Sequence, residues 1–434
     1  MRQKYLLLLF LCLWMCAGES RAELASLFGV GPQSEAMGAC SLLEGRASAY
    51  QVYSAPAALG FLHRVEISAG AQYMAANLRP FGTVVLDSSG TLGQYKSAGV
   101  RDGGGSVLAF AFPIGKQRPL TLAGTFYLPF GTLVRVSGSP VDFPFYPLYN
   151  DISGNFYFVL GAGYEFLDGW ALGINLRSTT KSTAYYKLVS NSSVNYSASA
   201  VEARGQTRFS VSLLYDHGRQ YEHQAWSVGL MVRAPSAMET KLSADITAFV
   251  PVQGALLSVP FYSPAEFVVM GSKKFGEFFI VSADLARVKW SDYVSPYGSG
   301  NINSYVIGSA YERANFHDIW VPKLGMEWKT HLSGKLVQEL DARAGYQYHP
   351  SPVPDQNADT NFVDNTRHMF SAGLGVVLDH PWQEQDTIAF DSFLQWNFLK
   401  QRNVHKNLAT NIGAPGYPTG GSIWLFGGAV TLKF

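Results

Sequence analysis

The last thirteen residues of the chain, Ser422–Phe434, read SIWLFGGAVTLKF. Successive side chains of a β-strand point to opposite faces, so Trp424, Phe426, Val430 and Phe434 share one apolar face. A strand that stops at a terminal aromatic residue is typical of the closing strand of an outer-membrane β-barrel. Such a strand must pair with the first one, because an unpaired edge in lipid leaves backbone groups unsatisfied. A last strand buried in a soluble sandwich shows the same pattern, so the rest of the chain has to decide.

The composition fits a membrane β-barrel. The 434 residues carry a formal net charge of +1, and 15% of them are charged, 14% are aromatic and 43 are glycines. Low charge with many aromatic and turn-forming residues is the profile of such barrels. The charge gives no indication of nucleic-acid binding. Past residue 22 no uninterrupted apolar run reaches the length of a transmembrane helix, so we expect any membrane span to consist of strands.

The N-terminal residues predict export. Arg2–Lys4 is basic, Tyr5–Met15 is apolar, and Ser20-Arg21-Ala22 has small residues at the positions that a signal peptidase reads. We therefore expect residues 1–22 to be a secretory signal peptide. Cys40 is then the only cysteine of the mature chain, so the exported protein must fold without a disulfide bond.

From His63 onward the chain consists of segments in which polar and apolar residues alternate. In Thr387–Leu399, Asp391, Gln395 and Asn397 share one face, and the other face is apolar. Soluble strands are usually about five or six residues long, and these segments are longer. Aromatic residues gather at the segment ends, where the interfacial girdles of a membrane barrel lie.

The connections alternate between short turns and long segments. Long connections lie near residues 79–104, 131–151, 184–204, 234–263, 291–318, 350–366 and 401–421. We count fourteen strands, which start near His63, Gly105, Leu120, Ile152, Trp170, Gly205, Ala225, Ala265, Glu277, Ile319, Leu336, Arg367, Thr387 and Ser422. An even number places both chain ends in the periplasm, with the long loops outside. A lumen of this width needs filling, and residues 23–62 are expected to fill it as a plug, while 63–434 form the barrel.

Several stretches resemble the FadL-type outer-membrane transporters of long-chain fatty acids and hydrocarbons. Ala25–Leu59 (ASLFGVGPQSEAMGACSLLEGRASAYQVYSAPAAL) resembles the family's plug, with Ala55-Pro56-Ala57 in place of its Asn-Pro-Ala motif. The other similar stretches are ADLARVKWSDY (Ala283–Tyr293), RAGYQYHPSPVPD (Arg343–Asp355) followed by DNTRHMFSAGLGV (Asp364–Val376), and the final IWLFGGAVTLKF. The resemblance covers nearly the whole mature chain. It implies an all-β fold, an antiparallel barrel of about 14 strands with a plug in the lumen, which transports hydrophobic small molecules.

The route of a long acyl chain must be apolar. Each buried CH₂ gains roughly 0.8 kcal/mol, so an aqueous pore would oppose a sixteen-carbon chain by roughly ten kcal/mol or more. The segment 234–263 is apolar for a loop, with Phe249, Val250, Val252, Leu256, Leu257, Val259, Phe261 and Tyr262. The resemblance implies a capture groove between this segment and the one with Tyr185, Tyr186, Leu188 and Val189. Packing of the loops against each other is the alternative.

The strand that starts at Trp170 carries candidate ligand-binding cations. Its alternation sends Leu172 and Leu176 toward lipid, and Arg177 and Lys181 toward the lumen. A fatty acid carboxylate needs a cation in an otherwise apolar pocket, so Arg177 is the first candidate partner and Lys181 the second. Equally, these cations could pair with acidic residues across the lumen, namely Asp284, Glu327 or Glu339.

The resemblance also implies lateral release through a wall opening at an inward kink in the third strand. That strand contains Gly124 and ends at Pro129-Phe130-Gly131. Proline cannot donate to a β-ladder and glycine permits a bend, so a local break is physically reasonable. Beside it, the second strand sends the small apolar Val107, Ala109 and Ala111 inward.

Within the plug, Phe28 is a candidate gate, together with Ala55, Pro56 and Ala57. Simple packing of Phe28 is the alternative. The further partners expected are outer-membrane lipid and the barrel assembly machinery, which would read the strand ending at Phe434, and we expect a monomer.

Other classes of protein fit the sequence less well. The nine His residues occur singly and no GxSxG motif is present, so we expect neither an enzyme nor a cofactor or metal site. A general diffusion porin is disfavoured by the plug and the apolar loop. A purely structural barrel or an adhesin is disfavoured by the apolar run, because its loops would be polar. The expected location is the bacterial outer membrane.

Overall fold

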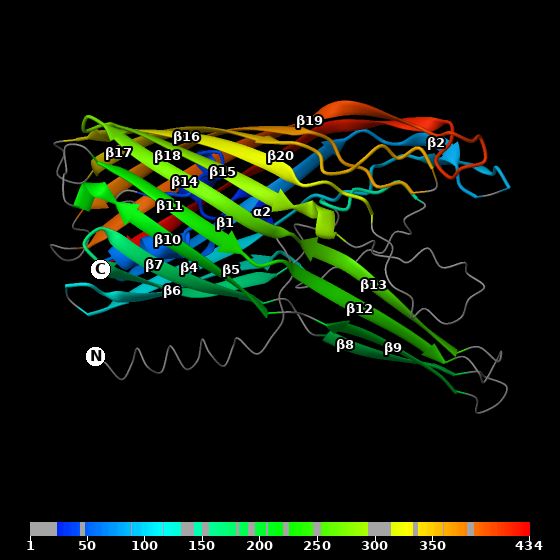
Figure 1. Cartoon of the computed structure of the whole chain (residues 1–434), viewed down its shortest axis with the longest axis horizontal. Helices are drawn as coiled ribbons and strands as arrows, with labels where there is room; N and C mark the ends of the chain where they lie inside the picture. Colours follow the sequence, from blue (N-terminus) through cyan, green and yellow to red (C-terminus); the bar gives the residue numbers. More distant parts are fainter. Residues whose placement is uncertain are drawn as a thin grey trace.

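The computed structural model describes residues 24–43, 48–87, 89–115, 117–131, 143–149, 156–178, 182–189, 196–204, 207–219, 225–245, 253–293, 314–332, 337–358, 360–379 and 386–434. Fourteen antiparallel strands close into one barrel, as the sequence predicts (Figure 1). They are β1 (Glu66–Leu78), β4 (Gly103–Ile114), β5 (Leu120–Pro129), β6 (Tyr157–Leu167), β7 (Trp170–Ser178), β10 (Thr207–Asp216), β11 (Trp226–Arg233), β14 (Ala265–Phe275), β15 (Phe279–Lys289), β16 (Ile319–His331), β17 (Val337–His349), β18 (Arg367–Asp379), β19 (Thr387–His405) and β20 (Gly416–Lys433).

The last strand closes the barrel on the first. β20 pairs with β1 over the whole length of β1, from Lys433 opposite Glu66 to Gly421 opposite Leu78. On its other side β20 pairs with β19. No edge of the barrel is therefore left open to lipid, as the apolar C-terminal stripe predicts.

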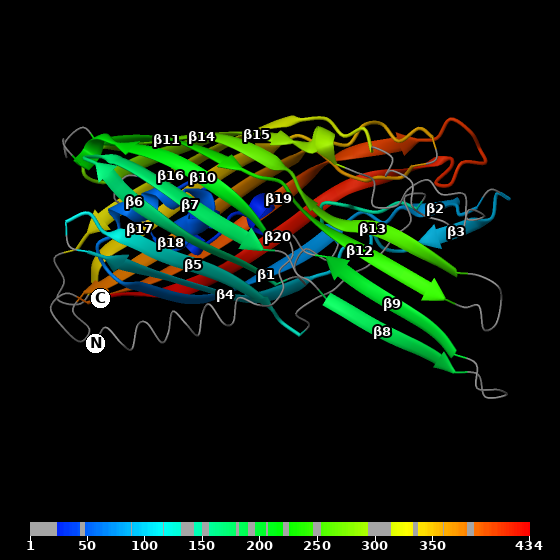
Figure 2. The same ribbon diagram turned by 60° about the horizontal axis from the view of Figure 1, so that its bottom comes forward.

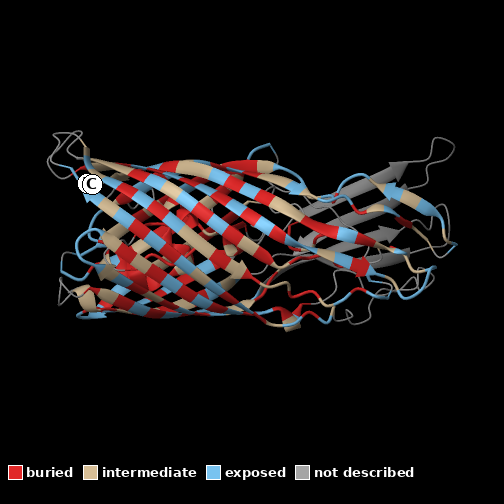
Figure 3. Cartoon of the chain, turned by 90° about the horizontal axis from the view of Figure 1, so that it is seen from above, coloured by how far each residue is buried: buried red, intermediate tan, exposed pale blue. Residues whose placement is uncertain are grey.

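The two faces of the wall follow the predicted alternation. Buried and exposed residues form stripes along the strands (Figure 3). On β7, Leu172 and Leu176 are 49% and 50% exposed, whereas Asn175 and Arg177 are buried. Polar residues therefore line the lumen and apolar residues face lipid.

Several stretches expected to be long loops contain strands: β2 (Gly82–Val85) and β3 (Leu92–Tyr95) lie in 79–104, and β19 and β20 extend into 401–421. Residues 184–204 and 234–263 contain β8 (Ser182–Val189), β9 (Tyr196–Arg204), β12 (Ser236–Asp245) and β13 (Gln253–Ser263), which form a sheet in the order β13-β12-β9-β8. Each of these strands is adjacent in sequence to a wall strand, and their order repeats the order β14-β11-β10-β7 of those wall strands in the barrel. The sheet leans away from the small hairpin of β2 and β3 (Figures 1 and 2).

The N-terminal segment lies inside the barrel and forms short helices. They are α2 (Leu24–Phe28), α3 (Pro32–Ala36), α4 (Gln51–Ser54) and the 3₁₀ helix η1 (Pro56–Phe61). Glycines with positive φ at Gly29, Gly31 and Gly38 interrupt the helices, and Pro32 starts α3 because its missing N–H is not needed there. In the described ranges no helix has the length and apolar character to cross a membrane. Two further 3₁₀ turns, η3 (His217–Arg219) and η5 (Trp290–Asp292), lie at strand ends.

Candidate functional site

Glycines of the wall allow the plug to lie directly against the barrel. A Cβ on Gly345 of β17 would collide with the backbone of Met37 and Gly38. On the opposite side, a Cβ on Gly173 of β7 would collide with the backbone of Pro56 and Ala57. The plug is therefore in backbone contact with two separate parts of the wall.

Hydrogen bonds from wall side chains fix the first half of the plug to β18 and β19. Arg367, Gln395 and Ser371 all bind plug backbone atoms. Their bonds are Arg367 Nη2 to Leu27 O (2.8 Å), Gln395 Nε2 to Phe28 O (2.7 Å) and Glu35 O (2.9 Å), and Ser371 Oγ to Ala36 O (2.8 Å), while Gly38 N–H donates to Ser371 Oγ (2.9 Å). Such bonds satisfy backbone groups that water cannot reach.

The second half of the plug is held by other strands. Asn175 Nδ2 of β7 donates to Val52 O (2.6 Å), and Ala57 N–H donates to Ser212 Oγ of β10 (2.7 Å). Ala55 stands where the resemblance has an asparagine, and here the polar side chains that hold this part of the plug come from the wall. The plug sequence alone does not show that side chains of the wall hold this part of the plug in place of an asparagine.

The inner face of β4 and β5 has a different character. Val107, Ala109, Ala111 and Ala123 are small, apolar and buried, and Thr125 lies among them. The predicted inward direction of the β4 residues is correct. A largely apolar surface therefore lines this part of the lumen.

The expected break in β5 is absent from this structure. Gly124 pairs with Phe110 of β4 and with Leu160 of β6, and the register is regular on both sides. Gly124 lies between the side chains of these two residues, on the outer face, so it relieves crowding there without bending the strand. Pro129 ends β5 and still stands opposite Gly105.

An aromatic cluster gathers at the extracellular end of the barrel, and we call it the cap cluster. Tyr293 stacks on Phe316 with ring centroids 4.6 Å apart, and Phe316 meets Phe362 edge-on at 5.4 Å. The other members are Phe81, Tyr95, Phe145, Tyr146, Tyr149, Tyr262, Trp290 and Tyr417. Most of them come from the long connections between strands. Most of these rings are buried, so the cap cluster is an apolar core above the plug.

The capture residues predicted on the apolar loops occupy strands at two edges of one sheet. Tyr185, Tyr186 and Leu188 belong to β8, and Leu256, Leu257 and Phe261 belong to β13. Two strands separate β8 from β13, which is roughly 14 Å at the usual spacing. Phe249, Val252 and Lys181 lie outside the described residues. Tyr262, at the end of β13, packs on Tyr293 at 5.5 Å, so this strand reaches the cap cluster.

Arg177 is buried on the inner face of the wall, the face that the alternation predicts, and the three acidic residues have other partners. Arg177 Nη2 donates to Ala234 O at 2.7 Å. Asp284 accepts from the Ser41 N–H and hydroxyl at 2.8 and 3.0 Å. Lys329 binds Glu339 at 2.7 Å. The acidic residues on the lumen side therefore form hydrogen bonds with the plug and ion pairs with nearby cations.

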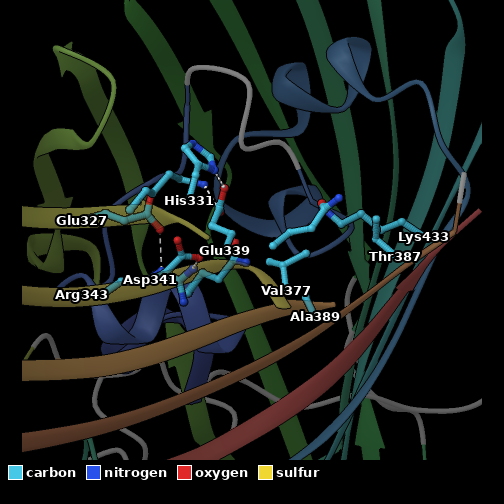
Figure 4. Close-up of a pocket in the computed structure, with 12 residues that line it drawn as sticks. Glu327, His331, Glu339, Asp341, Arg343, Val377, Thr387, Ala389 and Lys433 are labelled. Carbon is cyan, nitrogen blue, oxygen red and sulfur yellow. Dashed lines mark hydrogen bonds and ion pairs between the residues drawn. The ribbon is translucent and has the colours of Figure 1, made fainter. Parts of the chain in front are cut away.

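Glu327 belongs to an ionic network near the periplasmic end (Figure 4). The Arg343 guanidinium bonds to Glu327 (2.6 Å), Asp341 (2.5 Å) and Asp391 (2.5 Å), and all four side chains are buried. Asp391 also accepts from Gln33 of the plug at 3.1 Å. A cavity of about 280 Å³ lies beside the network, with charged side chains around it. A hydrophobic molecule gains nothing by entering such a cavity.

Phe28 lies at the contact between plug and wall. Its side chain is fully buried, and the Arg367 guanidinium lies 5.0 Å from its ring centroid. Arg367, which binds the plug at Leu27 O, is not among the residues that the sequence pattern predicts for the site. The alternation of the strand does predict its burial. Arg367, Met369 and Ser371 share one face of β18, opposite the outward-facing residues, so the Arg367 side chain points inward.

The architecture defines a class of protein. A closed barrel with a hydrogen-bonded plug, an aromatic cap and long extracellular connections is an outer-membrane transport barrel. The family model described as "Outer membrane protein transport protein (OMPP1/FadL/TodX)" matches residues 156–434, more than half of the chain. The chain belongs to this family, and its location is the outer membrane of a bacterial cell.

Individual proteins are similar over nearly the whole chain. Alkane uptake protein A of Marinobacter nauticus is 24% identical over 446 residues, which cover 97% of this chain and 93% of that protein. Among solved structures, a Pseudomonas aeruginosa FadL homologue has a TM-score of 0.58 at 12% identity, covering 96% of this chain and 98% of that one. The Ralstonia pickettii toluene transporter TbuX has a TM-score of 0.52 at 15% identity, covering 95% and 100%. These structures show the same fold.

In the described ranges no group of three or more His, Cys, Asp or Glu residues could hold a metal ion.

Proposed function

We propose that this protein carries long-chain hydrophobic molecules, fatty acids or hydrocarbons, across the outer membrane. The observation that carries the proposal is the cap cluster, a buried apolar core at the extracellular mouth above a lumen filled by the plug. A diffusion porin would need an open aqueous constriction, which a plug fixed on several sides opposes. The names of the relatives, an alkane uptake protein and a toluene transporter, point in the same direction.

Capture begins at the extracellular strands and the cap cluster. Leu256, Leu257 and Phe261 of β13 lead toward Tyr262, whose ring packs into the cap cluster. At the far edge of the same sheet, the molecule would contact Tyr185, Tyr186 and Leu188 of β8. The molecule then passes Phe28, which acts as the gate at the plug surface. Arg177 is our proposed partner for a carboxylate beside the plug, and Lys181 is its proposed neighbour.

Release occurs sideways through the wall at β5. The polar cavity and the ionic network at the periplasmic end oppose axial release of an apolar molecule. The inner faces of β4 and β5, with their small apolar side chains, offer an apolar route through the wall instead. Because β5 is paired on both sides, the opening requires β5 to part from a neighbour, and Gly124 and Pro129 weaken it there.

A cross-link tests the lateral opening. Thr125 of β5 and Val159 of β6 are opposite each other and both are buried. Oxidising Thr125→Cys/Val159→Cys in a Cys40→Ala background should abolish uptake of labelled oleate into liposomes, and a reductant should restore it. The matched control is Ala286→Cys/Val321→Cys, a buried pair across β15 and β16. Equal uptake by the oxidised β5–β6 variant and by the oxidised control would contradict release through this wall.

A further inference from the structure

We propose that the outer face of β19, β20 and β1 is a docking site for a phosphorylated glycolipid of the outer leaflet, with a phosphate group held between Lys400 and Arg79. The inference goes beyond the proposed transport, because it concerns the lipid-facing surface of the wall and not the route of the transported molecule. The partner is defined by its chemistry, namely several acyl chains below a sugar head that carries phosphate groups.

The part of the site that would contact acyl chains is an aromatic ledge on the outer face. Phe370, Trp396 and Trp424 are exposed and stand opposite one another on β18, β19 and β20. The ring centroids of Phe370 and Trp396 lie 5.8 Å apart, and those of Trp396 and Trp424 lie 6.0 Å apart. Tryptophan joins an apolar ring to a polar N–H, so the ledge suits the boundary between acyl chains and head groups.

The next outward-facing row toward the extracellular side is more polar. Its members stand opposite one another across β18, β19, β20 and β1, namely His368, Phe398, Ser422 and Asn77. The His368 ring also shares a hydrogen bond of 2.8 Å with Tyr346 Oη. Imidazole, hydroxyl and amide groups are costly in hydrocarbon but can bond to the ester and sugar oxygens of a glycolipid. The outer surface therefore changes from apolar to polar within two rows.

Two cations end this progression. Lys400 and Arg79 are exposed and flank Gly420 of β20. The Arg79 N–H donates to Gly420 O at 2.9 Å, and an irregularity after Leu399 leaves Lys400 opposite Gly420 on the other side. β19 and β1 are two strand spacings apart, roughly 10 Å, and Gly420 has no side chain to fill the space. Two long cationic side chains at this spacing can hold one phosphate from both sides.

Protein carboxylates do not neutralise these two charges in the described part of the chain. No ion pair between described residues involves Arg79 or Lys400. The acidic residues of the adjoining connections have other partners. Asp355 is ion-paired with Arg402 at 2.6 Å, and Asp102 accepts a backbone N–H of β1 at 2.7 Å. The positive charge of Arg79 and Lys400 therefore remains available to an anion from outside the protein.

The extracellular end of β15 has the opposite arrangement. Arg287 and Lys289 are exposed there as well, and the Arg287 guanidinium lies 5.8 Å from the ring centroid of Trp320. Each of these cations has a carboxylate partner, Asp318 at 3.2 Å and Asp292 at 2.8 Å. A cation beside an aromatic residue is thus common to both places, and the unpaired charge distinguishes the Arg79–Lys400 site.

The position of the site in the membrane selects the source of the phosphate. Lys400 and Arg79 lie at the extracellular ends of their strands, where the outer leaflet has its head groups. In a bacterial outer membrane this leaflet consists of phosphorylated glycolipid, whereas phospholipid forms the inner leaflet. Basic residues next to acyl-chain contacts are also the general means by which membrane proteins bind anionic lipids.

The test compares a glycolipid with and without its phosphates. The full-chain protein in detergent is titrated with diphosphoryl lipid A or with the same lipid A after enzymatic removal of both phosphates, and bound lipid is counted by native mass spectrometry. The wild type should bind the diphosphoryl form at least tenfold more tightly. Arg79→Gln/Lys400→Gln should lower that affinity to the level of the dephosphorylated form and leave the dephosphorylated form unchanged.

Two controls keep the outcome specific. Arg287→Gln/Lys289→Gln removes two exposed cations from β15 and should keep the full preference for the diphosphoryl form. Phosphatidylglycerol, an anionic phospholipid, should bind the wild type and the Arg79→Gln/Lys400→Gln variant within twofold of each other. Equal binding of both forms of lipid A by the wild type would overturn the inference. An equal loss in the β15 variant, or a loss for phosphatidylglycerol as large as for lipid A, would also overturn it, because attraction by surface charge alone would then suffice.

Discussion

At the scale of single residues, burial inside the barrel changes the pKa of a carboxyl group of the plug. Glu35 of α3 is fully buried, and burial raises the pKa of its carboxyl well above the ordinary value. Its backbone oxygen is bound by Gln395, whereas its side-chain Oε1 has no partner in the described residues. Burial therefore favours the protonated form of the Glu35 carboxyl, because an isolated buried charge is costly.

This burial predicts a pH-dependent stability. The folded state holds the Glu35 proton more tightly than the unfolded state, so stability is lost as the pH rises from the unfolded pKa toward the raised folded pKa. Glu35→Gln should remove that loss, by roughly 1.4 kcal/mol for each unit of pKa elevation. Urea-unfolding midpoints at pH 5, 7 and 9 would measure the difference, which should be small at pH 5 and largest at pH 9.

The control is Glu277→Gln in the exposed turn between β14 and β15. It should have the same midpoint as the wild type at all three pH values. A gain for Glu35→Gln that does not grow with pH would contradict the assignment of a raised pKa to this carboxyl.

At the scale of elements, the contact between β17 and the turn that follows α3 decides whether the plug is seated. Gly345 lies against the backbone of Met37 and Gly38, and Gly325 of β16 lies against Met37 as well. Backbone cannot move aside as a flexible side chain can, so a methyl group at Gly345 must displace the plug.

Gly345→Ala should therefore open a leak. We expect an ionic conductance in planar bilayers that the wild type lacks, together with uptake of a small sugar into liposomes. Gly271→Ala on β14 is the control, because the nearest atom to its added methyl group would be Ser227 O at 3.7 Å. Wild-type conductance in both variants would show that the plug yields without opening a path.

The sequence predicts some of these elements and not others. The alternation around Leu172 and Arg177 sets which face meets lipid, so the strand positions, the barrel closure at Phe434 and the inward direction of Ala109 follow from the chain alone. The strands β8, β9, β12 and β13 were missed, because their pairing depends on neighbours distant in sequence.

The candidate site was predicted less completely than the fold. Phe28 and Arg177 are buried where expected, but Arg367 and the partners of Arg343 depend on which strands are adjacent, which no single stretch reveals. The continuous pairing of Gly124 depends likewise on Phe110 and Leu160 beside it. Residue type and period set the face of a strand, and tertiary contacts set its partners.

At the scale of the whole molecule, three zones follow one another along the barrel axis. The apolar cap cluster comes first, the plug with its hydrogen bonds to the wall comes next, and the charged network around Arg343 comes last. An apolar molecule gains free energy in the first zone and none in the last. The order of the zones therefore accounts both for uptake from outside and for a lateral route of release.

The most direct test of this account is uptake by liposomes that contain the purified protein. Labelled oleate and a small labelled sugar are supplied in parallel, with protein-free liposomes as the background. The account predicts oleate uptake above background with no uptake of the sugar. Uptake of the sugar without preference for oleate would contradict a plugged hydrophobic route and would indicate a diffusion porin.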